Sequence, residues 1–161
     1  MTVEFRCATA RGRGYARGLR ADADRLMRAA GLDECELSLT LTSDRAIRRL
    51  NRDFRGIDTP TDVLSFSQIE QAGAAPPNPR SVKNSPGTPV GDVVISIDTA
   101  LRQAREYRVS PTSRLQRLLI HGFLHLIGYD HERSPADARR MFARERTLAA
   151  KIEQKVGDFS R

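Results

Sequence analysis

Tryptophan is absent from the 161-residue chain, cysteine occurs twice, and aromatic residues make up 6% of the sequence. The cysteines, Cys7 and Cys35, stand far apart and form no CxxC pair, which argues against a disulfide framework or a thiolate zinc cluster. The longest apolar runs are too short to cross a bilayer, and the N-terminus lacks the apolar stretch of a signal peptide. We therefore expect a cytoplasmic protein with no membrane segment and two unpaired cysteines.

Lysine is also scarce: lysine and arginine total 27 residues, of which 24 are arginine, against 20 acidic residues, so that the formal net charge is +7. The guanidinium fork binds phosphate groups in a bidentate manner, so this charge favours a nucleic-acid partner. A GC-rich genome would also place arginine at ordinary solvated positions, and the charge alone leaves both explanations open. Hydrophobic residues at 39% and charged residues at 29% indicate a folded globular chain rather than a disordered one.

Hydrophobic periodicity predicts strands and helices in the order βαβαββααα. The strands are expected over 2–8, 36–42, 63–67 and 90–97, and the helices over 15–30, 44–54, 98–107, 112–127 and 135–156. This order predicts an α+β fold, a single domain over 1–161 built on a small, about four-stranded mixed sheet packed with helices. Residues 68–89 contain five prolines and no periodicity, which indicates a mobile surface loop.

Two helices carry local signals at their ends and on their faces. Ser43 or Thr42 is expected to cap the helix over 44–54. Its apolar residues fall at helical spacing, so we expect one buried stripe of Ile47, Leu50 and Phe54. Asp98 is expected to cap the helix that it begins.

The three histidines of the chain all lie in one segment, HGFLHLIGYDH, as His121, His125 and His131. The first two are four residues apart on a predicted helix, so their imidazoles share one face. That helix is apolar nearly all round and is expected to be a buried, zincin-like helix that carries two of three metal ligands. Gly128 allows a left-handed turn that would return the chain and bring His131 to the same ion. Three imidazoles suit Zn²⁺, with water in the fourth position, which is the catalytic arrangement.

The same spacing occurs in metzincin peptidases, which carry glutamate directly after the first histidine. Here that position is Gly122, so the general base of peptide hydrolysis is missing. Asp130 and Glu132 flank the third histidine and are candidates to orient an imidazole or accept a proton, although exposed loop carboxylates would look the same.

Four segments together carry a resemblance to a known family: HGFLHLIGYDH, TDVLSF over 61–66, GDVVIS over 91–96 and LNRDFRG over 50–56. They resemble the YbeY family of bacterial rRNA-maturation endoribonucleases, and the similarity covers essentially the whole chain. The resemblance implies a zinc-dependent hydrolase that cuts single-stranded RNA in 16S rRNA 3′-end maturation and ribosome quality control, in contact with the small ribosomal subunit.

The resemblance also implies roles for particular residues. His121, His125 and His131 would be the zinc ligands and part of the catalytic centre, and Arg55 would be the catalytic arginine that binds the scissile phosphate. An arginine at a helix end can instead satisfy terminal carbonyls. Asp62 is expected to fix the start of a strand or to line the cleft, and Ser65 is expected to be structural. Arg45, Arg48, Arg49 and Arg52 are candidates to hold RNA, or simply form a solvated helix face.

Two other functions remain open from the sequence. One is a non-catalytic ribosome-assembly factor in which zinc is structural, and the other is a zinc peptidase, which Gly122 disfavours. The nucleophile, either metal hydroxide or the 2′-hydroxyl of the substrate, is undecided, as is the oligomeric state.

Overall fold

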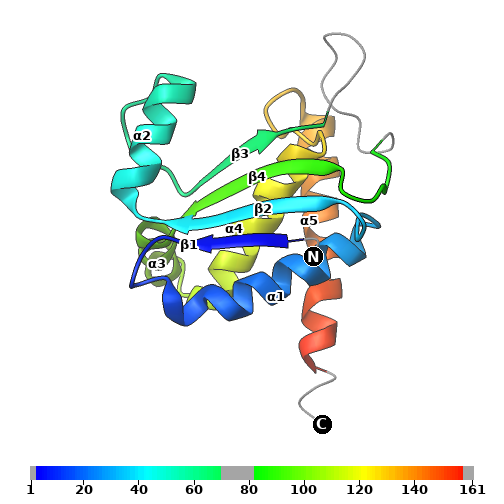
Figure 1. The fold of residues 1–161 in the computed structure, drawn as a ribbon, viewed down its shortest axis with the longest axis horizontal. Coiled ribbons are helices and arrows are strands. Elements are labelled where there is room, and N and C mark those ends of the chain that lie inside the picture. Colours follow the sequence, from blue (N-terminus) through cyan, green and yellow to red (C-terminus); the bar gives the residue numbers. More distant parts are fainter. Residues whose placement is uncertain (1–2, 70–81, 158–161) are drawn as a thin grey trace.

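A computed structural model of the protein describes residues 3–69 and 82–157, and Figure 1 shows its fold. The strands are β1 (Val3–Cys7), β2 (Glu36–Thr42), β3 (Val63–Ser67) and β4 (Pro89–Ser96). The helices are α1 (Arg13–Ala29), α2 (Asp44–Arg55), α3 (Ile97–Glu106), α4 (Pro111–Leu126) and α5 (Pro135–Gly157). Element order and the α+β class follow the sequence prediction, and each boundary lies within two residues of the predicted one.

The four strands form one mixed sheet in the order β1-β2-β4-β3. β1, β2 and β4 are parallel, whereas β3 pairs antiparallel with β4 and forms one edge. Helix α1 joins β1 to β2, whereas α2 and the edge strand β3 lie between β2 and β4 in the chain. The site described below lies against this antiparallel edge.

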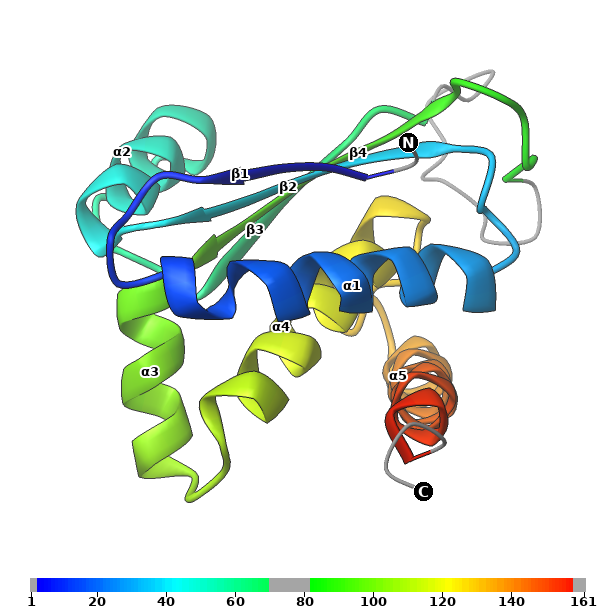
Figure 2. The ribbon, with the colours of Figure 1, turned by 60° about the horizontal axis from the view of Figure 1, so that its bottom comes forward.

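The helices cover the two faces of the sheet unequally. Figure 2 shows α1, α3, α4 and α5 on one side of the sheet and α2 near one end on the other side. The main core lies between the sheet and the first group, and it includes nearly every apolar residue of α4. This confirms the prediction of a buried central helix. α2 forms a smaller cluster on the opposite face, where Ile47 packs with Leu64 and Val94.

Helix α2 differs from prediction at its last apolar residue. Ser43 caps it, since the Ser43 hydroxyl accepts a hydrogen bond from the N–H of Ala46 at 3.2 Å. Ile47 is buried and Leu50 packs beside it, as expected. Phe54 does not complete the buried stripe: 68% of it is exposed, because the second core cluster ends one turn before the helix does.

The predicted cap of α3 is also wrong. The hydroxyl of Ser96 caps this helix by accepting from the N–H of Thr99 at 3.3 Å, because the helix begins one residue earlier than expected. Asp98 instead contacts two other segments. Its carboxylate accepts the Asp44 N–H at the start of α2 at 2.9 Å and pairs with Arg11, in the turn before α1, at 2.7 Å. Its charge therefore ties the start of α2 to the start of α3.

The structure covers only part of the predicted loop over 68–89, because residues 70–81 lie outside the described residues. The part over 82–88 is tied to the turn before β2. The side chain of Asn84 accepts the Glu34 N–H at 2.8 Å and donates to Asp33 at 3.0 Å. Cys35 and Cys7 are both free, and Cys35 is buried while Cys7 is partly buried. Within the described chain, no helix is both long and apolar enough to cross a membrane.

Candidate metal centre

Helix α4 supplies the first two histidines and lies unusually close to the sheet. Ser110 caps the helix, with Pro111 in its first turn. A Cβ atom at Gly122 would lie 2.9 Å from the Val93 side chain and 3.0 Å from the Val63 side chain. Glycine therefore permits the close approach of α4 to β3 and β4, and there is no room there for the glutamate of a peptidase motif.

Two hydroxyls of β3 bind the backbone of α4 directly. Ser65 donates to the carbonyl oxygen of Gly122, and Ser67 donates to that of Leu126, each at 2.8 Å. Alternate residues of a strand point to the same face, while carbonyls four residues apart lie along one side of a helix, so the two bonds match in spacing. Ser65 is structural, as expected, and it holds the helix that carries the ligands against the edge strand.

The third histidine arrives through the turn after α4. Gly128 has a positive φ of 111°, and the Tyr129 N–H returns to the carbonyl of Leu124 at 3.0 Å. Arg133 donates to the Gly128 carbonyl at 2.7 Å and so closes the turn. His131 is thereby brought back over the helix, as the sequence predicts.

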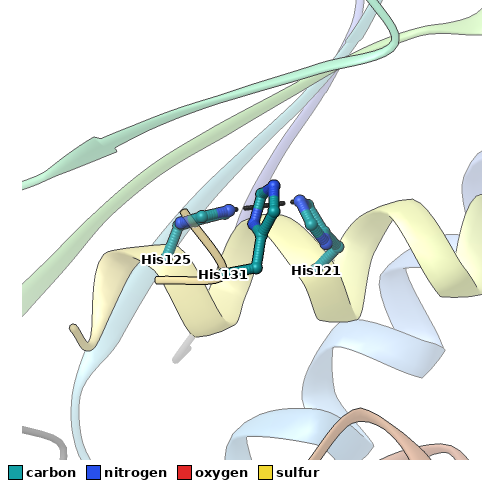
Figure 3. A group of neighbouring side chains, drawn as sticks. All are labelled: His121, His125 and His131. Atoms are coloured by element: carbon teal, nitrogen blue, oxygen red, sulfur yellow. Dashed lines mark hydrogen bonds between the residues drawn. The ribbon is translucent and has the colours of Figure 1, made fainter. Parts of the chain in front are cut away.

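The three imidazoles converge on one point, as Figure 3 shows. The Nε2 atoms of His121 and His125 are 3.1 Å apart, and His131 offers a ring nitrogen such that all three ligand atoms lie within 4.8 Å of one another. Zinc–nitrogen bonds of about 2.0–2.1 Å put tetrahedral ligands roughly 3.3 Å apart, so small side-chain adjustments would bring the three onto one ion. Nδ1 of His131 is buried without a hydrogen-bond partner in the described structure. The donor set and this unpartnered nitrogen fit a metal.

A carboxylate from α5 orients the first histidine. The Nδ1–H of His121 donates to Oε1 of Glu145 at 2.9 Å, which leaves Nε2 directed toward the other two imidazoles. Carboxylates in this position fix the tautomer of a ligand and raise its basicity. Glu145 is not among the residues that the sequence predicts for the site. The available signal was that Glu145 falls on the same helix face as the buried residues Met141 and Leu148.

The electrostatics of the site favour the neutral form of His125 by lowering its pKa. Burial lowers its pKa below the usual 6.5, and the neighbouring His121 and His131 lower it further, while Asp130 opposes the shift. A metal binds the unprotonated imidazole, so this shift extends the pH range in which His125 is ready to act as a ligand.

A cavity of about 670 Å³ opens beside the histidines and is partly lined by Arg55. Arg55 is the last residue of α2, and Gly56 follows it with a φ of 71° that ends the helix. The structure thus brings together on one cavity the four predicted catalytic residues, which come from α2, α4 and the turn after α4. The side chains of His121 and His131 are 33% and 36% exposed, so the centre is open on the cavity side.

Three carboxylates also line this cavity: Asp62, Asp130 and Glu132. Asp62 has both expected roles, because it also fixes the strand start by accepting the Val63 N–H at 2.7 Å. Asp130 accepts the Glu132 N–H at 2.9 Å and pairs with Arg133 at 3.4 Å, so it stabilises the turn. The carboxylate of Glu132 is more open, with 80% of its side chain exposed and His131 at 3.8 Å.

The other arginines of α2 do not line the cavity. Arg48 pairs with Asp58 at 2.9 Å, and Arg52 pairs with Asp53 at 3.1 Å, both on the exposed surface. Their contact with RNA stays a prediction.

The fold and the site together define a class: small α+β proteins in which a buried helix presents two histidines, and the next turn a third, to a metal site open to a cavity. This arrangement is typical of metal-dependent hydrolases. A family model described as endoribonuclease YbeY matches residues 15–153 of the chain. The chain belongs to the YbeY family, and as a member it is an enzyme of the hydrolase class.

Individual relatives agree with this assignment, and each of the following is named endoribonuclease YbeY. The Anaeromyxobacter sp. (strain Fw109-5) protein is 48% identical over 92% of this chain and 71% of its own length. The Geobacter metallireducens protein is 47% identical over 84% and 85%, respectively. The Myxococcus xanthus protein is 50% identical over 91% of this chain but 46% of its own length, so the chain spans less than half of that relative.

A solved structure shares the fold. The solution structure of a Thermotoga maritima protein superposes with a TM-score of 0.65 and covers 97% of this chain and 92% of its own, at 24% sequence identity.

Proposed function

We propose that this protein is a zinc-dependent, single-strand-specific endoribonuclease that acts in the cytoplasm in 16S rRNA 3′-end maturation and ribosome quality control. The observation that carries the proposal is the convergence of three histidines and Arg55 on one cavity. The names of the relatives, which are endoribonucleases, and the net charge of +7 support RNA as the substrate.

The histidines and Glu145 would hold the metal. His121, His125 and His131 are the three ligands, and Glu145 keeps His121 in the tautomer that turns Nε2 to the ion. A bound Zn²⁺ supplies a Lewis acid beside the scissile phosphate and makes hydroxide available near neutral pH.

Arg55 would bind the phosphate. Its guanidinium is not desolvated in the free protein, since the residue is exposed, and it can turn toward a phosphodiester that enters the cavity. Two parallel N–H donors match two non-bridging phosphate oxygens and neutralise the charge that develops as the bond breaks.

Two routes for the nucleophile remain, and one substrate separates them. An RNA with a single 2′-deoxy nucleotide at the cleavage site has no 2′-hydroxyl to attack the phosphate. If water is the nucleophile, this RNA is cut at a normal rate. If the 2′-hydroxyl is the nucleophile, it resists, and the ordinary RNA yields a 2′,3′-cyclic phosphate.

The openness of the site favours catalysis over a structural zinc. Structural zinc centres are closed by four protein ligands, whereas here three histidines face a cavity and two of them are partly exposed. A peptidase is disfavoured by Gly122, whose Cβ position is occupied by the sheet.

The test is cleavage of single-stranded RNA by protein as isolated, after treatment with a chelator, and after zinc is restored. We expect cleavage that follows the metal and that Arg55→Ala lowers by about 100-fold or more. Arg17→Ala is the matched control, because it removes the same charge from an exposed position on α1 away from the cavity. Absence of cleavage by the zinc-loaded protein would refute the activity, and unfolding on zinc removal would favour the structural alternative.

The ribosomal part of the proposal needs its own assay. Small ribosomal subunits that carry an unprocessed 16S rRNA 3′ end should be trimmed faster than the same RNA free in solution. Equal rates would argue against recognition of the subunit.

A further inference from the structure

Phe54 is an exposed aromatic side chain placed where substrate would enter. Among the large hydrophobic residues of the described chain, it is the most exposed, at 68%. It lines the same cavity as Arg55 and the histidines. A single exposed phenylalanine is common on protein surfaces. Phe54 is distinguished by its place, because it lies on the cavity that Arg55 and the histidines also line.

The ring of Phe54 is supported from one side. It meets the ring of Phe66 edge to face, with centroids 5.2 Å apart and an interplanar angle of 65°. Phe66 lies on β3 and packs against the cluster of Ile47, Leu64 and Val94. Phe66 is therefore held by the cluster while Phe54 stays exposed beside it, an arrangement that suits a surface for stacking better than a closed core.

The neighbours of Phe54 indicate what would stack on it. Arg55, the next residue, lines the cavity with a guanidinium suited to phosphate. Proteins that bind single strands combine such cations along the backbone with aromatic rings on which unpaired bases stack. In a duplex, both faces of a base are covered by the neighbouring base pairs that stack on it, so a protein ring can stack only on an unpaired or unstacked nucleotide.

We propose that Phe54, supported by Phe66, is a base-stacking platform that positions an unpaired nucleotide next to the phosphate bound by Arg55. This inference rests on the proposed function and deepens it, because it assigns the preference for single strands to one side chain. Phe54 is a positioning residue, since it acts on the substrate away from the reacting atoms.

The absence of tryptophan from the chain allows a direct test. Phe54→Trp creates the sole indole of the protein, whose fluorescence is quenched when a base stacks on it. The probe is a single-stranded 2′-O-methyl RNA of about eight nucleotides, compared with an abasic strand of equal length and charge and with a duplex of the same sequence. Tyr107→Trp is the control, since Tyr107 is 54% exposed at the end of α3 but does not line the cavity.

We expect the single strand to quench Phe54→Trp while the abasic strand and the duplex leave it unchanged, and Tyr107→Trp to respond to none of them. Phe54→Leu keeps an apolar side chain but removes the ring. It should raise the KM for single-stranded RNA by about 5- to 30-fold and leave kcat nearly unchanged, as for an interaction made equally before and during the reaction.

Quenching by the abasic strand as strong as by the normal strand, or a wild-type KM for Phe54→Leu, would overturn the platform while leaving the nuclease activity intact. Conversely, base-dependent quenching by a protein that cuts no RNA would support the platform and refute the activity. The two proposals therefore fail in distinguishable ways.

Discussion

Gly122 allows a quantitative test of how closely α4 must approach the sheet. In Gly122→Ala, the new methyl group would lie 2.9 Å from Val93 Cγ1, 3.0 Å from Val63 Cγ2 and 3.1 Å from Ser65 Oγ. The first distance is shorter than a carbon–carbon contact at its optimum of about 3.5–4.0 Å. The helix or the strands must therefore shift, and the shift would also stretch the bond from Ser65 to the Gly122 carbonyl.

The expected magnitude is the difference between two opposing effects. Alanine in a helix interior is more favourable than glycine by about 1 kcal/mol. Overpacking a close-packed interface costs about 1–3 kcal/mol. We expect Gly122→Ala to be destabilised by up to about 2 kcal/mol, because Val93 is fully buried and has little room to move away.

Gly18 supplies a matched control. It lies in the interior of α1, and nothing is within 4 Å of the position where its Cβ would stand. Gly18→Ala should therefore keep only the helix-propensity gain and be stabilised by about 0.5–1 kcal/mol. The two variants carry the same chemical change, and their difference isolates the contact with the sheet.

Thermal and urea unfolding of both variants, together with zinc affinity by competition with a chelator, would measure these effects. For a domain of this size, 1 kcal/mol corresponds to about 2–4 °C in Tm. Gly122→Ala should lose both stability and zinc affinity, because His121 is the preceding residue of the displaced helix. If Gly122→Ala were stabilised as much as Gly18→Ala, the contact of α4 with the sheet would not be tight enough to exclude a methyl group at position 122.

Three further predictions concern other parts of the structure. Glu145→Ala should weaken zinc binding about 10- to 100-fold without loss of the fold, as measured by chelator competition, because His121 loses the carboxylate that orients it; unchanged affinity would contradict that role. Asp44→Asn should cost about 1–3 kcal/mol at neutral pH: burial raises the pKa of Asp44, but hydrogen bonds from Ser96, Thr99 and Arg102 outweigh it and hold the pKa below 3.8. The stability that the Asp44 charge contributes is thus present above the unfolded-state pKa of about 3.9 and is lost as the pH falls through the lower folded-state pKa. The unfolding free energies of wild type and Asp44→Asn should therefore converge in acid. A difference in urea unfolding that stays constant down to low pH would show that the charge is not its source. Ser65→Ala should cost about 1 kcal/mol and Ser67→Ala less, because Ser67 is more exposed; equal losses in thermal unfolding would show that exposure does not weaken the second bond.

Most of the fold could be predicted because each element carries a local signal. Alternating leucines mark β2, and the apolar run of α4 marks a helix that is largely buried. The histidine cluster could also be predicted, because the helical repeat and a glycine turn bring together residues that are near in sequence. These inferences need no knowledge of distant contacts.

The errors and omissions arise where distant segments decide the outcome. Phe54 fits the helical period of Ile47 and Leu50, yet it contacts Phe66, which is itself only partly buried, and that depends on where β3 runs. Glu145 reaches His121 only because α5 packs against α4. Asp98 has the residue type of a cap, but Ser96 begins the helix earlier and Asp98 binds the start of α2 instead.

The exposed Phe54 and the buried Gly122 have a common physical origin. Gly122 and Ser65 draw α4 against β3, which places His121 and His125 at the antiparallel edge of the sheet. α2 leads into that same edge strand, and its end carries Phe54 and Arg55 past the last residues of the second core cluster. Phe54, Arg55 and the three histidines line one cavity, so a side chain that covered Phe54 from the cavity side would take up space beside the histidines. If RNA is the substrate, as we propose, the exposure of Phe54 leaves this space open to it.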